Sequence, residues 1–255
     1  MAITLDQIKS LRDKTGVSIT TCKAALEEAN GDEEKAIEIL RKKGQAKAVD
    51  RADRTTGEGT VAVYSDGLSK VSMLTLNCET DFVAKSPEFV SAAEMYAKML
   101  FDNAGVDFAE IVTDLGAKMG EKVEMANKTV VEGSLVASYV HSNKKVGVIV
   151  SLDGGNEEVA RDVAMHCAAT RPMYLSPTEV SAESIAKEMV IWNDELKTSG
   201  KPEAIWGKIL EGKEKKFREE NALLTQSFVK NPDLTIEGYL NANSAKLVSY
   251  VVFSI

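Results

Sequence analysis

The apolar residues change their spacing near Gly59, and this change constrains the fold more than any other feature of the sequence. Before that point they recur at helical spacing, whereas residues 59–76 alternate, as in a hairpin of strands with one buried face. A helical pattern follows at 89–101. The same succession recurs at 133–152 and 157–169. The sequence therefore predicts a helical amino-terminal unit followed by two similar subdomains, each a hairpin backed by a helix.

The first 43 residues predict three short amphipathic helices that pack as a bundle. Their expected capping residues are Thr4 (in a capping box with Gln7), Ser18 and Asp32. Their expected ends are Thr15-Gly16, Asn30-Gly31 and Lys43-Gly44. The side chains expected to face inward are Leu5, Ile8, Leu11, Cys22, Ala25, Leu26, Ala29, Ala36, Ile37 and Leu40. So small a bundle buries little surface, so we expect a docking module, joined to the rest by a linker at 47–59.

A second helical region lies between residues 181 and 220. Its apolar stripe comprises Ile185, Met189, Trp192, Leu196, Ile205, Ile209 and Phe217, and it is interrupted at Ser199-Gly200-Lys201-Pro202. This pattern predicts an antiparallel helical hairpin. Residues 247–253 alternate enough to form a strand that returns to a sheet begun before the hairpin, which would make the hairpin an insertion.

Charge and composition indicate which kinds of partner the protein can bind and in which cellular compartment it works. A net charge of −8 would repel phosphate backbones, so we expect no direct binding of nucleic acid. No apolar run approaches the roughly 20 residues that a membrane-spanning helix needs, and residues 1–15 lack the pattern of a signal peptide. The three cysteines, Cys22, Cys78 and Cys167, are odd in number and widely spaced, which argues against disulfide bonds. We expect a cytoplasmic protein whose partner is a protein or a small molecule.

The sequence offers little for catalysis. Its two histidines, His141 and His166, have no metal-ligand spacing to other residues, and His166 fits a core or interface position better than a ligand. Nucleophile-elbow, phosphate-loop, dinucleotide-binding and zinc-protease motifs do not occur. We expect no catalytic residues, no metal site and no cofactor.

The most conspicuous local motif is residues 77–85, Asn-Cys-Glu-Thr-Asp-Phe-Val-Ala-Lys, between a predicted strand and the helix expected to start at Pro87. Two interpretations stay open from the residues alone. Phe82 could cap the core beneath the loop. Alternatively, Asp81 and Phe82, hereafter the wedge pair, could be exposed, so that the aromatic ring fills a pocket of a partner and the carboxylate fixes it there.

This motif resembles the signature of the elongation factor Ts family. Further resemblances follow in the order of that family: Leu11-Arg12-Asp13-Lys14-Thr15-Gly16-Val17, Cys22-Lys23-Ala24-Ala25-Leu26, Asn30-Gly31-Asp32, Ser138-Tyr139-Val140-His141, Val146-Gly147-Val148-Ile149-Val150, Ala164-Met165-His166 and Ser199-Gly200-Lys201-Pro202. The resemblance extends from Thr4 to Phe253.

The resemblance implies an α+β fold with a UBA-like three-helix bundle, a core of two related α/β subdomains with antiparallel sheets, and an inserted antiparallel coiled-coil hairpin. The corresponding domains are residues 1–55 (bundle and linker), 56–132 (core subdomain 1), 133–180 with 225–255 (core subdomain 2) and 181–224 (hairpin).

The resemblance also implies a function without catalysis, namely guanine nucleotide exchange on elongation factor Tu, bound in its GDP form and free of nucleotide. The wedge pair would insert between helices of that partner near its nucleotide-bound magnesium. The residues that match partner contacts of the family are Ile19, Thr20, Lys23, Thr80, Asp81, Phe82, Val83, Met119, Gly120, His141 and Val229.

The sequence departs from the family at two places. Many relatives have Met-Met-Asp at Ile19-Thr20-Thr21, and some have a helical extension beyond the position of Ile255, so these contacts would differ.

Two rival functions stay open. One rival is an adaptor that binds through the UBA-like bundle alone. The other is an enzyme using Glu79, Asp81 and His141 in a cleft between the subdomains. The hairpin stripe would serve a homodimer and a single partner equally well.

Overall fold

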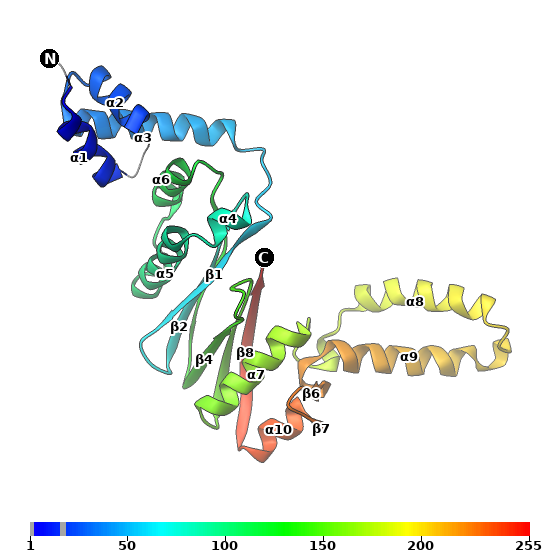
Figure 1. Cartoon of the computed structure of the whole chain (residues 1–255). Helices are drawn as coiled ribbons and strands as arrows, with labels where there is room; N and C mark the ends of the chain where they lie inside the picture. Colours follow the sequence, from blue (N-terminus) through cyan, green and yellow to red (C-terminus); the bar gives the residue numbers. More distant parts are fainter. Residues whose placement is uncertain (1–2, 16–18) are drawn as a thin grey trace.

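The computed structural model describes residues 3–15 and 19–255, with 45–50 described by their backbone alone. The fold combines helices with antiparallel sheets, as predicted, and three helices lie at its amino-terminal end (Figure 1). These are α1 (Leu5–Thr15), α2 (Ile19–Glu28) and α3 (Glu33–Asp50). The helix end expected at Gly16 and the cap expected at Ser18 lie outside the described residues.

The amino-terminal helices begin and pack largely as their sequence predicts. Thr4 and Gln7 form the capping box, in which the Thr4 N–H donates to the Gln7 side chain at 3.0 Å and the Gln7 N–H donates to the Thr4 hydroxyl at 3.2 Å. The buried core of the bundle is Ile8, Leu11, Cys22, Ala25, Leu26, Ala29 and Ala36. The prediction for Leu5 is wrong, since this side chain is 73% exposed. Ile3, just ahead of the helix, packs against the core instead.

The prediction that Lys43-Gly44 ends the third helix is also wrong, because α3 continues to Asp50 and occupies part of the expected linker. A Cβ atom at Gly44 would lie 3.1 Å from that of Ala117 on α6 (Ala109–Met119). Gly44 thus does not end α3. Its lack of a side chain allows α3 to approach α6 closely. Arg41 lies 3.5 Å from Glu110 on the same face of contact.

The first sheet combines the predicted hairpin with a third strand from further along the chain. Its strands are β1 (Glu58–Ser65), β2 (Lys70–Cys78) and β3 (Glu124–Glu132), antiparallel in the order β1-β2-β3. The helices of this part are α4 (Asp81–Ala84), α5 (Pro87–Asp102) and α6. Leu74 and Leu76 of β2 pack against Phe89 and Leu100 of α5 in one buried cluster. Neither α6 nor β3 was predicted.

The second sheet repeats this plan. Its strands are β4 (Leu135–Val140), β5 (Val146–Gly154) and β8 (Ala245–Ser254), antiparallel in the order β4-β5-β8. Helix α7 (Glu157–Thr170) covers it, as α5 covers the first sheet. The last strand returns to the sheet as predicted. Three further elements precede it, namely β6 (Ser227–Phe228), β7 (Asn231–Thr235) and α10 (Ile236–Ala242).

The two sheets pack face to face through a shared apolar layer. Val61 and Met73 from the first sheet and Val136 and Ile149 from the second are buried in it. Gly147 lies where the two sheets approach each other closely, because a Cβ atom there would collide with the Val61 side chain and come within 2.9 Å of the Met73 sulfur. Alternate residues of β1 and β2 therefore face the helices or the second sheet, so both faces are buried.

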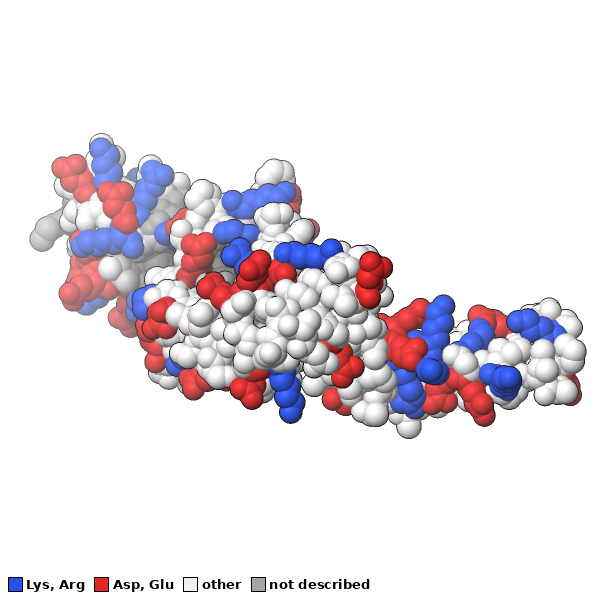
Figure 2. Space-filling model, turned by 90° about the horizontal axis from the view of Figure 1, so that it is seen from below, with Lys and Arg blue, Asp and Glu red and all other residues white. Residues whose placement is uncertain are grey.

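Helices α8 (Ala182–Thr198) and α9 (Trp206–Asn221) run side by side and project from the body of the molecule (Figure 1). The rings of Trp192 and Phe217 pack edge to face across them, 5.9 Å apart. Ile205 does not belong to the buried stripe, since it lies in a 3-10 turn (Glu203–Ile205) and is 45% exposed. Figure 2 shows charged side chains of both signs along this projection. None of the helices among the described residues is long and apolar enough to cross a membrane.

Candidate partner-binding site

Phe82 has the most exposed large apolar side chain of the described part of the chain, with 84% of it accessible. It lies on α4, a single helical turn between β2 and α5. Thr80 caps this turn, because its hydroxyl accepts the Val83 N–H at 3.4 Å. The interpretation that Phe82 caps the core beneath the loop is therefore wrong. Ala84 and Phe89 are the buried residues there.

Asp81 presents a negative charge beside this ring. Its carboxylate binds the Lys85 ammonium at 2.7 Å, one helical turn further on. The hydrogen bond from Lys85 and its positive charge lower the pKa of Asp81 below the usual range. The wedge pair is thus an exposed aromatic ring with an ionised, half-buried carboxylate next to it.

Met119 and Gly120 lie at the end of α6, in a loop bonded to the turn that precedes the wedge pair. Gly120 has a φ of +78°, in the left-handed region, and ends the helix as its C-cap. The chain then turns so that the carboxylate of Glu121 accepts the backbone N–H groups of Glu79 and Thr80, at 3.0 Å each. The structure thus connects two predicted contact segments through Glu121.

This role of Glu121 could not be predicted from the sequence. Glu121 follows Glu79 by 42 residues and Thr80 by 41 residues, and no local pattern predicts a contact over such a separation in sequence. The one available signal was Gly120, since a glycine after a helical pattern predicts a helix end from which the next side chain is redirected.

Ile19, Thr20 and Lys23 are exposed on α2, in the amino-terminal bundle and apart from α4 (Figure 1). Ile19 is 50% exposed, so its apolar side chain is accessible to a partner. Lys23 lies 3.7 Å from Glu27, in an exposed pair that contributes little to stability. These residues form a second surface patch on the side of α2 that faces solvent.

His141 and Val229 lie near adjacent residues of α7. His141 is exposed at the end of β4, and its Nδ1 is 3.1 Å from the Tyr139 hydroxyl. With Met165 of α7 it lines a hollow of about 340 Å³. Val229, 47% exposed between β6 and β7, donates its N–H to Nδ1 of His166, the residue after Met165. The core position predicted for His166 is confirmed, since it is fully buried.

A buried carboxylate holds the segment next to Val229. Asp162 of α7 is 7% exposed, and it accepts hydrogen bonds from Lys230 Nζ at 2.6 Å and from the Tyr239 hydroxyl at 3.0 Å. Burial, followed by the hydrogen bond and charge of Asp162, raises the pKa of Tyr239 to about 12. Helix α7 thus fixes the β6–β7 turn and α10.

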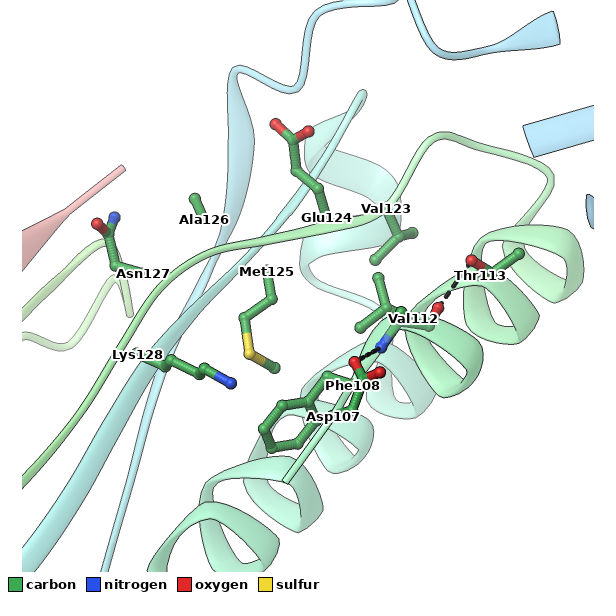
Figure 3. A pocket seen from close by; sticks show the side chains of 11 residues that line it. Asp107, Phe108, Val112, Thr113, Val123, Glu124, Met125, Ala126, Asn127 and Lys128 are labelled. Carbon is green, nitrogen blue, oxygen red and sulfur yellow. Dashed lines mark hydrogen bonds between the residues drawn. The ribbon is translucent and has the colours of Figure 1, made fainter. Parts of the chain in front are cut away.

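A hollow of about 480 Å³ between the start of α6 and β3 holds none of the predicted contact residues. Figure 3 shows Met125 pointing from β3 toward Phe108 at its base. The ammonium group of Lys128 donates to the Val106 carbonyl at 3.1 Å and lies over the Phe108 ring. Its charge is therefore already engaged by this chain.

The acidic and imidazole groups of the enzyme hypothesis each bind a different neighbour. Glu79 binds Arg54 at 3.2 Å, Asp81 binds Lys85, and His141 lies beside Tyr139. Burial raises the pKa of the Cys78 and Cys167 thiols to about 12, so both are protonated and unreactive at neutral pH. Within residues 3–15 and 19–255 no group of three His, Cys, Asp or Glu side chains is arranged to hold a metal ion.

Comparison with known proteins shows the family to which this chain is similar. The family model described as "Elongation factor TS" matches residues 79–255. A protein named elongation factor Ts from Idiomarina loihiensis is 39% identical, over 100% of this chain and 91% of its own length. Proteins of the same name from Hydrogenobaculum sp. and Kineococcus radiotolerans are 40% and 39% identical, over 100% and 99% of this chain and 99% and 98% of their own lengths.

Proposed function

Because the chain belongs to the elongation factor Ts family, we propose that it is the guanine nucleotide exchange factor of elongation factor Tu during translation. It binds that GTPase in its GDP form and promotes release of GDP. The observation that carries the proposal is Phe82, a large aromatic side chain 84% exposed beside an ionised carboxylate. Exposed aromatic anchors of this kind are typical centres of protein–protein interfaces.

The wedge pair acts by changing the shape of the nucleotide site from outside. Phe82 enters between helices of the GTPase, and Asp81 fixes it there. Displacing these helices disturbs the magnesium ion and the phosphate-binding loop, which carry the largest charges that neutralise the diphosphate. No bond is made or broken, so the exchange factor needs no catalytic residue of its own.

Linkage explains why such binding must release GDP. If this chain binds the nucleotide-free GTPase more tightly than the GDP form, the bound chain lowers the affinity of the GTPase for GDP by the same factor. The binding energy of the whole interface therefore drives the release. Further contacts strengthen the preference without touching the nucleotide.

The remaining predicted residues supply these contacts. Thr80 and Val83 flank the wedge pair, and Met119 and Gly120 meet the nucleotide-binding domain. Ile19, Thr20 and Lys23 form the contact of the amino-terminal bundle. His141 and Val229 face the third domain of the GTPase. Exposure supports this assignment for all of them except Val83 and Met119, which are half-buried against the core of the first sheet.

The proposed setting is the cytoplasm, without direct binding of nucleic acid or membrane. The division into a bundle with linker (1–55), two core subdomains (56–132, and 133–180 with 225–255) and an inserted hairpin (181–224) is part of the proposal. An adaptor function of the bundle alone is less well supported, because α3 packs closely on α6 through Gly44 and Ala117.

The test is release of a fluorescent GDP analogue from elongation factor Tu in excess unlabelled GDP. We expect catalytic amounts of this protein to accelerate release, and the nucleotide-free complex to be isolable and dissociated by added GDP. A folded sample that neither accelerates release nor forms that complex contradicts the exchange function. Binding of an isolated fragment 1–45 to other proteins would then favour the adaptor.

A further inference from the structure

The carboxylate of Glu121 accepts three hydrogen bonds from the turn that precedes the wedge pair. Its Oε2 accepts the N–H groups of Glu79 and Thr80, and its Oε1 accepts the Thr80 hydroxyl at 2.5 Å. Hydrogen bonds to a charged acceptor are about twice as strong as those between neutral groups. One side chain from the α6–β3 loop thus holds three polar groups of the turn that leads into α4.

These bonds determine the orientation of the Thr80 hydroxyl. Its single proton is donated to Glu121, so its lone pairs are left to accept the Val83 N–H at 3.4 Å. That second bond is the N-cap of α4. A helix of four residues is too short to form by itself, because helix nucleation is unfavourable. Its cap therefore decides whether Phe82 is held in its outward position.

A second carboxylate completes the connection in the opposite direction. Glu79 Oε1 accepts the Lys122 N–H at 2.6 Å, and the Arg54 guanidinium binds both of its oxygens at 3.2 and 3.3 Å. The Lys122 N–H, followed by Arg54, lowers the pKa of Glu79, so it stays ionised beside Glu121. The Lys122 ammonium donates to the carbonyls of Ala52 and Arg54 at 2.8 and 3.0 Å. The two loops therefore bind each other reciprocally.

We propose that Glu121 is a positioning residue for nucleotide exchange, which holds the Thr80 cap and thereby presents Phe82 to the GTPase. The inference rests on the exchange function proposed above. Glu121 acts through Thr80 rather than by touching the partner, since its oxygens are directed at the turn of its own chain. It also connects the Met119–Gly120 loop to the wedge pair, so that both contact segments meet the partner in a fixed position relative to each other.

The first measurement uses the isolated protein and does not depend on exchange. Amide hydrogen exchange of Thr80 and Val83 is followed by NMR in the parent, in Glu121→Ala and in Glu124→Ala. Glu124 is the matched control, because it is an acid of the same segment that binds Thr56 and Lys122 but not the wedge turn. We expect protection of both amides to fall in Glu121→Ala alone. The fall should be about tenfold or more for Thr80, whose N–H loses its bond to a charged group, and Val83 should follow because its acceptor, the Thr80 hydroxyl, is no longer held.

The second measurement is GDP release from elongation factor Tu over a range of exchange-factor concentrations. If the wedge must be ordered on binding, Glu121→Ala requires about tenfold more protein for half-maximal release, while the rate at saturation changes less. Glu121→Gln keeps one acceptor oxygen for the two N–H groups and should recover part of the loss. Glu124→Ala should behave like the parent.

A double-mutant cycle tests whether Glu121 acts through the cap. Thr80→Val removes the hydroxyl, so Glu121→Gln in that background should add much less than it does alone. Additive effects, or normal release by a Glu121→Ala protein that has lost amide protection, would overturn the proposal. Unchanged protection of both amides would overturn it as well. If the parent itself does not accelerate release, the exchange function fails, and the amide measurement still decides whether Glu121 holds the turn.

Discussion

The Nδ1 atom of His166 lies 3.3 Å from the backbone nitrogen of Val229 and accepts its hydrogen bond. The neutral ring therefore carries its proton on Nε2, which donates to Gln226 at 2.9 Å. Burial lowers the pKa of His166 below its ordinary value of 6.5. Below pH 6.5 the imidazole of His166 binds a proton more readily in the unfolded chain than in the folded chain. The contribution of His166 to stability is therefore complete above pH 6.5 and falls as the pH is lowered toward the folded-state pKa.

Urea unfolding at about pH 7.5 and about pH 5.5 measures this effect. We expect the parent to lose stability at the lower pH and His166→Asn to lose distinctly less, although that variant is weaker at both values. His141→Asn, at an exposed histidine, is the control and should follow the parent. An equal loss in all three proteins would contradict the role of His166.

The contact of Gly44 with Ala117 predicts a dependence on side-chain size. Gly44→Ala places a methyl group 3.1 Å from the Ala117 Cβ, a tight contact that the gain in helix propensity, up to about 1 kcal/mol, offsets. Gly44→Leu cannot be accommodated and should cost about 1–3 kcal/mol by separating α3 from α6. Limited proteolysis between residues 51 and 57, together with urea unfolding, checks this order. Equal behaviour of the two variants would show that α3 does not need the close approach.

The Asp162–Lys230 pair should stabilise the protein more than a typical surface pair. Lys230→Met leaves a carboxylate that is 7% exposed with Tyr239 as its remaining partner in this cluster. Because the Lys230 side chain is itself 49% exposed, we expect a cost of about 1–2 kcal/mol, below that of a fully buried pair. Lys187→Met is the matched control, since its pair with Glu183 is exposed and should contribute under about 1 kcal/mol. Thermal or urea unfolding of both variants decides, and equal losses would contradict the prediction.

Local patterns predicted the elements whose signals lie within a few residues of one another. The Thr4–Gln7 capping box, the alternating strands of both hairpins and the returning strand β8 all depend on such short-range signals. The burial of His166 followed from its position on the apolar side of a helical pattern. These features were predictable because periodicity and capping are properties of the local chain.

Other features depend on tertiary contacts that no local pattern reports. Gly44 reads as a helix end, yet it lies inside α3 because α6 packs against it. Strand β3 was missed because its middle residues are polar and exposed, so its apolar alternation is weak. The exposure of Phe82 could not be decided from the residues alone. It depends on the short helix that Thr80 and Glu121 hold.

The wedge pair is tested most directly by GDP release from elongation factor Tu with the parent, Phe82→Ala and Met173→Ala. Met173 is a suitable control, because it is also a large apolar side chain, 62% exposed, outside the proposed contacts. Loss of an aromatic anchor costs about 2 kcal/mol or more, so Phe82→Ala should reduce the acceleration at least about tenfold. Met173→Ala should match the parent. Full acceleration by a folded Phe82→Ala protein would contradict insertion of Phe82 as the step that releases GDP.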